Sequence, residues 1–424
     1  MYEITTLSNG IRTVSYESRD RESVSIGIWI GVGGRYENDT VKGAAHFLEH
    51  IAFKGSKEYT CKQIKELIEG VGGTLNAFTS EEQTCFFAKI PYRYLEQTFD
   101  VLADIVLYPK IAKSDVDKER MVILEEIKMY KDMPQYFVLE LLDELLWPNH
   151  PLGKTLTGTP ESVMGLTNKA LRRFHQRYYS ANNIVVAGVG KLKHSKIVRM
   201  VRKKMKVLAS TSNKDDYLKV TGYENIPKAV FFKKDVEQMH VALGIPAFDE
   251  NHKDRYIMGL LNIILGGNMS SRLFVELREK KGLAYSISSS VKTLHDTGVF
   301  IIRAGVDNRK IVEAVKLILA ELNKISTSLV SSNEFDRARD YLLGQLLLGL
   351  EDTMEHMLWV GEDLITRNKV RTIQHVVREF KKIKREDISR VAKEIINPAN
   401  FRLSIVGPIK DEQEEKIRSF LGIK

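Results

Sequence analysis

The two halves of the chain close with the same succession of elements, and this duplication constrains the fold more than any other feature. The first half ends with "ALRRFHQRYYSANNIVVAGVGKLKHSKIVRMVRKKM" and the second with "DISRVAKEIINPANFRLSIVGPIKDEQEEKIRSFL". Each has a helical pattern, an asparagine (Asn183 or Asn400) that opens an apolar strand, a Val-Gly turn and a last helix. The segments "NIVVAGVG" and "NFRLSIVG" have the same length. Because a repeat of this kind marks a recurring structural unit, the sequence predicts two homologous halves.

A polar stretch separates the halves. Residues 209–220, "ASTSNKDDYLKV", show no clear periodicity, which is typical of a linker. A chain of 424 residues also exceeds what one hydrophobic core usually covers. We therefore predict a first half at 1–208, a linker at 209–222 and a second half at 223–424.

The pattern of elements predicts the fold class. Asn9-Gly10 indicates a hairpin, and alternate apolar residues from Val24 to Val32 indicate a half-buried strand. Residues 72–90 indicate two strands joined at Ser80–Glu82. Helical patterns follow at 60–69, 92–106, 114–131 and 134–146, and the second half repeats the outline with a helix near 252–265. Hairpins grouped with helices predict an α+β fold of two homologous halves, each an antiparallel sheet with helices packed on one face.

Composition excludes several classes of protein. No apolar run approaches the roughly 20 residues of a membrane span, and the N-terminal stretch lacks the basic and apolar regions of a secretory signal. Cys61 and Cys85 are too few for a disulfide framework, so we expect a reducing, cytoplasmic location and no membrane partner.

The formal net charge of +9 raises the question of nucleic acid. Basic residues are mostly interleaved with acidic ones, as on a solvated helix face, and no nucleic-acid-binding signature accompanies them. We therefore expect no nucleic-acid partner. A mild preference for acidic peptides explains the positive charge slightly better.

The stretch "GAAHFLEHIAFKGS" carries the strongest chemical signal. An apolar face and the absence of proline predict a helix, on which His46 and His50 stand four residues apart and converge on one ion. Glu49 lies beside such an ion without having to bind it. The pattern H-x-x-E-H is the inverted form of the zincin signature, and a catalytic zinc site needs one more protein ligand. The alternative is a pair of surface histidines on an ordinary helix.

A second predicted helix, "KSDVDKERMVILEEIKMYKD", offers the missing ligand. Glu119 and Glu126 are seven residues apart and share one face, whereas Glu125 points about a quarter-turn away. One carboxylate would complete a site of two histidines and a glutamate, and the other would orient a ligand. Taken alone, the charge pattern of this helix indicates only a solvent-exposed face.

Together these residues resemble the pitrilysin or insulinase family of metallopeptidases, in particular its bacterial branch similar to the mitochondrial processing peptidase. Further resemblance lies in "GGTLNAFTSEEQT", "LTGTPESV" and "SSRLFVELREKKGLAYSI", in the same order along nearly the whole chain. The resemblance implies that His46, His50 and Glu126 bind zinc, that Glu49 is the catalytic base and that Glu119 supports the ligands. It also implies one Zn²⁺ per chain, because the second half has no histidine pair at the corresponding place. Such a site would also accept cobalt or manganese.

The resemblance implies further residues for peptide substrates. Arg278 and Tyr285 match a pair that in this family reaches from the second half toward the bound peptide, whereas their spacing alone indicates an exposed arginine and a buried strand tyrosine. The stretch Asn76, Ala77, Phe78 and Thr79 resembles the edge strand whose backbone pairs with an extended peptide.

Assembly and role follow from the same resemblance. Four homologous halves close a chamber in this family, so a chain with two halves is expected to form a homodimer, or a heterodimer with a related chain. The function expected is that of a zinc metalloendopeptidase acting on flexible peptides. The alternatives are a protease dedicated to maturation of a leader peptide and a non-catalytic scaffold subunit of a processing-peptidase-like complex.

Overall fold

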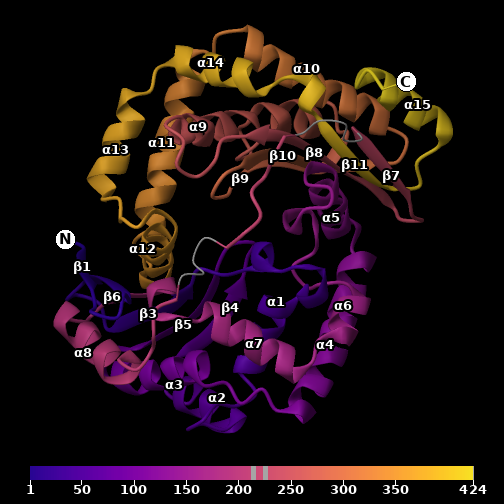
Figure 1. Cartoon of the computed structure of the whole chain (residues 1–424). Helices are drawn as coiled ribbons and strands as arrows, with labels where there is room; N and C mark the ends of the chain where they lie inside the picture. Colours follow the sequence, from indigo (N-terminus) through magenta and orange to yellow (C-terminus); the bar gives the residue numbers. More distant parts are fainter. Residues whose placement is uncertain (212–215, 223–227, 424) are drawn as a thin grey trace. The chain divides into compact units, whose positions relative to one another are not determined.

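Two compact units make up the chain, each built on one sheet (Figure 1). A computed structural model describes residues 1–211, 216–222 and 228–423. Unit 1 comprises residues 1–127, 155–218 and 347–372, and unit 2 comprises residues 128–154, 219–346 and 373–424. Part of the predicted linker at 209–222, residues 212–215, lies outside the described residues.

The sheet of unit 1 has six strands in the order β1-β2-β6-β3-β5-β4. The strands are β1 (Glu3–Thr6), β2 (Arg12–Glu17), β3 (Ser23–Ile30), β4 (Thr74–Thr79), β5 (Thr84–Pro91) and β6 (Ile184–Gly190). The predicted hairpin is confirmed, since β1 and β2 are antiparallel and Gly10 between them has a φ of 92° that suits glycine. Neighbouring strands are antiparallel except β2 and β6, which are parallel.

The helices that the first half contributes to this unit lie close to where the sequence predicted them, except the short one at 160–165, for which no helix was predicted. They are α1 (Ala44–Ala52), α2 (Cys61–Glu69), α3 (Leu95–Leu107), α4 (Lys113–Asp132), α6 (Pro160–Gly165), α7 (Asn168–Tyr178) and α8 (His194–Met205). The Thr60 side chain accepts a hydrogen bond from the Gln63 N–H and so caps α2. None of the helices in the described ranges has the length and apolar composition that crossing a bilayer requires.

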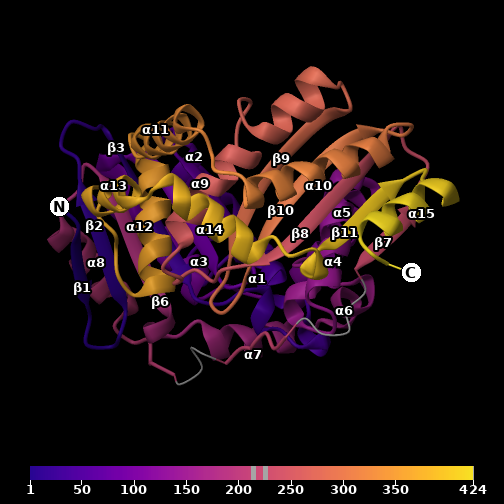
Figure 2. The same cartoon turned by 90° about the horizontal axis from the view of Figure 1, so that it is seen from above.

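Unit 2 repeats this plan with a five-stranded sheet in the order β7-β11-β8-β10-β9. Its strands are β7 (Ala229–Lys233), β8 (Gln238–Ala247), β9 (Ala284–Thr293), β10 (Gly298–Asp307) and β11 (Arg402–Gly407). Its helices are α5 (Pro134–Leu146), α9 (Arg255–Leu265), α10 (Ile311–Thr327), α11 (Ser332–Gly349), α13 (Ile373–Lys382), α14 (Arg385–Ile395) and α15 (Asp411–Phe420). In Figure 2, α10 and α14 lie across one face of the sheet. As in unit 1, the strand that closes the half has a parallel neighbour, which is β7 for β11 and β2 for β6. The predicted α+β fold with two homologous halves is thereby confirmed.

Two helices are exchanged between the halves of the sequence. Helix α12 (Thr353–Arg367), from the second half, packs against β3 and β6 of unit 1, and α5, from the first half, packs against β8 and β11 of unit 2 (Figure 1). Each sheet therefore carries a helix on the face opposite its other helices. The predicted boundary at 209–222 separates the two repeated halves of the sequence. The compact units do not follow this boundary, because residues 128–154 belong to unit 2 and residues 347–372 belong to unit 1.

The exchange explains why β3 is more buried than its alternation predicted. Ile26 and Ile28 lie in the core under the helices of the first half, and Trp29 on the opposite face is 1% exposed. Trp29 packs there in a cluster with Met357 and Val360 of α12. Both faces of β3 are thus covered by apolar side chains.

Candidate metal centre

Helix α1 is fixed at its N-terminus by a buried ion pair. The Glu37 carboxylate accepts hydrogen bonds from the backbone N–H groups of Gly43 and Ala45, at 2.9 and 2.7 Å. The Lys42 ammonium lies 3.2 Å from the same carboxylate. Gly43 has a φ of 90°, and a Cβ there would lie 2.7 Å from the carbonyl oxygen of Thr157. A negative side chain bound to free N–H groups at a helix N-terminus is stabilising, so the start of α1 is held in one position.

The apolar face of α1 sets the direction of its polar face. Phe47, Leu48 and Ile51 are at most 2% exposed and belong to the core of unit 1. His46 and His50 lie on the other side and are only partly buried. Packing of the apolar face therefore turns both imidazoles away from the core.

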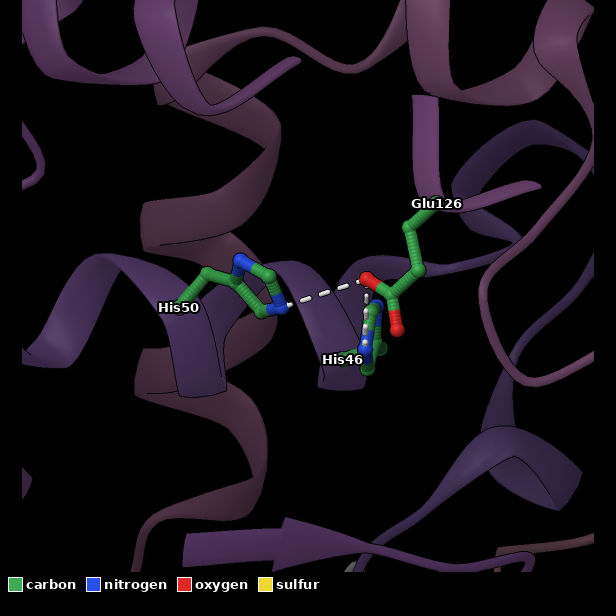
Figure 3. Close-up of side chains that lie close together, drawn as sticks. All are labelled: His46, His50 and Glu126. Carbon is green, nitrogen blue, oxygen red and sulfur yellow. Dashed lines mark ion pairs between the residues drawn. The ribbon is translucent and has the colours of Figure 1, made fainter. Parts of the chain in front are cut away.

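The two imidazoles meet a carboxylate from α4 (Figure 3). The Oε2 atom of Glu126 lies 3.7 Å from Nε2 of His46 and 3.6 Å from Nε2 of His50. One ligand atom from each of the three residues lies within 4.8 Å of the others. The structure thus brings together the three residues that the family resemblance implied as metal ligands.

This donor set fits zinc. A tetrahedral zinc ion with bonds of about 2.1 Å holds neighbouring ligand atoms about 3.4 Å apart, close to the separations of the glutamate oxygen from the two nitrogens. Burial, together with the neighbouring His50, lowers the pKa of His46 to about 3, so its ring is neutral at ordinary pH. Neutral imidazole is the form that binds metal. Three protein ligands are also the number that a catalytic zinc site uses.

Glu119 lies beside the site on the same helix as Glu126. Its Oε2 atom is 3.2 Å from Nδ1 of His50, and its Oε1 atom is 2.7 Å from the ammonium of Lys54. Glu119 is 5% exposed. A carboxylate that receives the second ring N–H of a ligating histidine fixes the ring and its tautomer, which is the supporting role predicted for Glu119.

Glu49 faces the strand β4. The hydroxyl of Thr79 donates a hydrogen bond of 2.6 Å to Oε2 of Glu49. Burial raises the pKa of Glu49 above its usual value, while this hydrogen bond acts in the opposite direction. Glu49 is thus a partly buried carboxylate with one oriented oxygen, next to His50 on the same helix as both histidines.

The predicted peptide-binding stretch lies on an edge strand. β4 pairs only with β5, so its other backbone edge has no strand beside it among the described residues. The ring of Phe78 packs edge-on against Trp29, with ring centroids 5.5 Å apart. The N–H of Ala77 donates to the side-chain oxygen of Asn76 at 2.9 Å, so this side chain partly covers the backbone edge.

Arg278 and Tyr285 belong to unit 2. Arg278 lies on the π-helical segment η7 (Phe274–Lys280), with its guanidinium 5.0 Å from the centre of the Phe274 ring. Tyr285 lies on β9 and is 62% exposed, unlike the buried strand tyrosine that its spacing alone indicated. Their part in the site stays a prediction.

Two partners of the site were not predicted. Lys54 follows His50 by four residues, so the helical spacing alone could have placed it beside the same carboxylate. Thr79 was predicted as part of a peptide-binding backbone, and its side chain in addition contacts Glu49. That contact joins a helix to a strand and leaves no pattern in the sequence.

Two family models match consecutive parts of the chain. A family model described as Insulinase (Peptidase family M16) matches residues 12–160, which include α1 and α4. A model described as Peptidase M16 inactive domain matches residues 165–342. Helix α9 of that region, "RYIMGLLNIIL", has neither histidine nor glutamate.

Several curated relatives match over nearly their whole length. An uncharacterized zinc protease of Streptomyces coelicolor is 34% identical over 97% of this chain and 91% of its own. An uncharacterized zinc protease of Mycobacterium leprae is 35% identical over 95% of this chain and 91% of its own. The uncharacterized zinc protease YmxG of Bacillus subtilis is 32% identical over 95% of this chain and 97% of its own. The family and the names of these relatives point to a zinc protease.

Solved structures show the same fold. A protease from Helicobacter pylori superposes with a TM-score of 0.87 at 26% identity, covering 96% of this chain and 99% of that one. A peptidase M16 inactive domain from Pseudomonas fluorescens has the same TM-score at 18% identity, covering 96% of this chain and 98% of that one. At this identity the similarity concerns the fold alone. By its two family models, its curated relatives and its fold, the chain belongs to the insulinase family, peptidase family M16.

Proposed function

We propose that this chain is a zinc-dependent endopeptidase that hydrolyses peptide bonds in flexible peptides. The observation that carries the proposal is the convergence of His46, His50 and Glu126 within 4.8 Å, beside a partly buried Glu49 that does not belong to that ligand set. A metal site with a spare carboxylate next to it is what metal-assisted hydrolysis needs.

Each residue near the metal has a distinct role. Zinc, when bound by the three ligands, supplies a positive charge that polarises the scissile carbonyl and lowers the pKa of water. Glu49 accepts the proton of the attacking water and passes it to the leaving amine. General acid–base help of this kind is worth roughly 10² to 10⁴ in rate. Thr79 orients the Glu49 carboxylate through its hydrogen bond, and Glu119 orients His50.

Peptide binding is proposed at the free edge of β4. An extended peptide that adds there would form backbone hydrogen bonds, which depend little on sequence, so specificity is expected to be broad. The side chain of Asn76 would have to release the Ala77 N–H for that bond to form. Arg278 and Tyr285 are proposed to donate hydrogen bonds to the peptide and to the oxyanion that develops during attack.

The partner is proposed on the family resemblance, and the location on the small number of cysteines. A homodimer, or a heterodimer with a related chain, would supply four homologous halves to one chamber. Multi-angle light scattering of the purified protein tests the dimer, since a homodimer has twice the mass of one chain, which is 48.4 kDa. We propose a cytoplasmic location, which fractionation of cells would test.

The experiment that tests the function compares four proteins. Zinc content and cleavage of a quenched fluorescent peptide are measured for the wild type, Glu49→Gln, Glu126→Gln and the exposed neighbour variant Glu125→Gln. We expect one zinc per chain and chelator-sensitive cleavage in the wild type and in Glu125→Gln. Glu49→Gln should keep zinc and lose cleavage, and Glu126→Gln should lose both.

The alternatives give other results. Bound zinc without cleavage of any peptide in a varied set would favour a protease dedicated to one leader peptide, or a chain that needs a partner. A wild-type protein that binds no zinc would contradict the proposal and favour the scaffold subunit. An active Glu49→Gln variant would remove Glu49 from its role.

A further inference from the structure

A cavity of about 590 Å³ lies in unit 1, outside the metal centre. Its walls come from the segment 107–111, from the C-terminal part of α7 and the residues after it, and from residues 208–211 at the start of the connection between the halves of the sequence. Pockets that hold small molecules have volumes of roughly 300 to 1,000 Å³. The cavity therefore has room for a small organic molecule.

Two of its lysines are positioned by a short antiparallel backbone pairing. The N–H of Lys57 donates to the carbonyl oxygen of Tyr108 at 3.0 Å, and the N–H of Lys110 donates to that of Gly55 at 3.0 Å. Between them, Ser56 forms an isolated bridge with Pro109. The backbone that carries the two lysines is thus held in register beside the cavity.

A third cation is fixed to the same segment. The guanidinium of Arg172, on α7, donates to the carbonyl oxygens of Lys110 and Ile111, the latter at 3.2 Å. Both hydrogen bonds use Nη2, which leaves the other N–H groups of Arg172 to other acceptors. Three positively charged residues from three separate parts of the chain thus line one cavity.

The described lining of the cavity is unbalanced in charge. Among the described residues that line it, none is an aspartate or a glutamate. Lys57 lies 3.6 Å from Glu58, but both side chains are largely exposed, and such pairs are weak. A cavity that has cations and no carboxylates attracts anions.

The remaining walls are apolar and aromatic. Leu107, Ile111 and Leu208 line the cavity, and the Lys57 ammonium lies 5.6 Å from the centre of the Tyr108 ring. A ring stack forms another part of the wall, where His175 and Tyr179 lie with centroids 4.3 Å apart and planes 29° apart. These surfaces suit a flat or apolar body.

We propose that this cavity binds a small organic anion, with its phosphate or carboxylate group at Lys57, Lys110 and Arg172 and its apolar body against the aromatic and aliphatic walls. Residues 208–211 form one wall, so an occupant would contact the connection between the two halves of the sequence. The site shares no residue with the metal centre and does not depend on the proposed peptidase activity.

The test measures binding of two anions and their neutral counterparts. Dissociation constants of phenyl phosphate and phenol, and of indole-3-acetate and indole-3-acetamide, are determined by isothermal titration and ligand-detected NMR. They are measured with the metal present and after its removal by a chelator, because a carboxylate could otherwise bind the ion. We expect at least one of the anions to bind saturably in both states, at least tenfold more tightly than its neutral counterpart.

Two variants with equal net charge locate the site. Lys57→Glu/Lys110→Glu reverses two cations of the cavity, and Lys65→Glu/Lys118→Glu reverses two exposed lysines that do not line it. The first variant should bind the anion at least tenfold more weakly, and the second within about twofold of the wild type, with thermal unfolding showing that both are folded. The proposal is overturned if neither anion binds below several millimolar, if binding disappears with the metal, or if the two variants bind alike.

Discussion

The Oε2 atom of Glu119 lies 3.2 Å from Nδ1 of His50, while Nε2 of the same ring faces Glu126 at 3.6 Å. One helix, α4, therefore contacts both nitrogens of one imidazole through carboxylates seven residues apart. A receiving carboxylate at Nδ1 leaves Nε2 without a proton and directs its lone pair toward the ligand position. The spacing of Glu119 and Glu126 thus sets both the orientation and the tautomer of His50.

Replacement of Glu119 should weaken metal binding without removing a ligand. Glu119→Leu keeps a buried side chain of similar volume but loses the partner of His50, and loss of such a partner typically costs 10- to 100-fold in metal affinity. Competition with a chelator of known zinc affinity measures the change. Glu125→Leu, an exposed position on the same helix, is the control and should bind zinc like the wild type. Equal affinities in the two variants would contradict the role of Glu119.

Replacement of Thr79 should slow turnover and leave the metal in place. Thr79→Val keeps the shape of the side chain but removes the donor that holds Oε2 of Glu49 at 2.6 Å. We expect a loss in kcat of about tenfold, since a hydrogen bond to a charged group contributes about 1.5 kcal/mol or more. Thr79→Ser should restore most of the rate because it restores the hydroxyl. A Thr79→Val enzyme with unchanged kcat and full zinc content would show that Glu49 needs no help from this strand.

The packing of α12 on the sheet of unit 1 should be sensitive to the addition of one methyl group. A Cβ on Gly361 would lie 2.1 Å from Nε1 of the buried Trp29, so Gly361→Ala forces a shift in the packing. Overpacking of this kind typically costs about 1 to 3 kcal/mol. Gly344→Ala, in helix α11, meets nothing within 4 Å and should be neutral or slightly stabilising. Denaturant unfolding measures the difference in the free energy of unfolding between the two variants. Equal free energies would show that α12 packs loosely on the sheet.

Low pH should weaken the packing of α12 on the sheet of unit 1, because His356 lies on this helix and becomes protonated. Burial lowers the pKa of His356 to about 4, from about 6.5 in the unfolded chain, so between these values the unfolded state binds more protons. The contribution of His356 to stability is therefore complete above pH 6.5 and falls as the pH decreases toward 4, by at most about 1.4 kcal/mol per pH unit. Urea unfolding at several pH values should show a shallower decline for His356→Phe than for the wild type. Parallel declines would mean that His356 is protonated without penalty.

Much of the site was predictable because its geometry is local. His46, Glu49 and His50 lie within two turns of one helix, and their directions follow from the helical period once the apolar face of α1 is identified. The same holds for Glu119 and Glu126 on α4. The asparagine-led closing strands, being repeated, predicted the two related sheets.

The parallel pairs β2–β6 and β7–β11 were not predicted, because the placement of the closing strand depends on which neighbour it meets across more than 150 residues. The exchange of α5 and α12 was also missed. An amphipathic helix shows which of its faces is apolar, but not which sheet covers that face.

The sequence by itself predicted the fold class and the duplication from short-range periodicity and repeated spacing, and its resemblance to the insulinase family supplied the assignment of the metal ligands. Only the tertiary structure decided that Thr79 contacts Glu49, that Lys54 and His50 share Glu119, and that Trp29 is covered by a helix from the other half of the sequence. Those contacts join residues whose separation along the chain carries no periodic signal. They form because burial of apolar faces brings distant segments together, and polar side chains then take the partners that this packing leaves within reach.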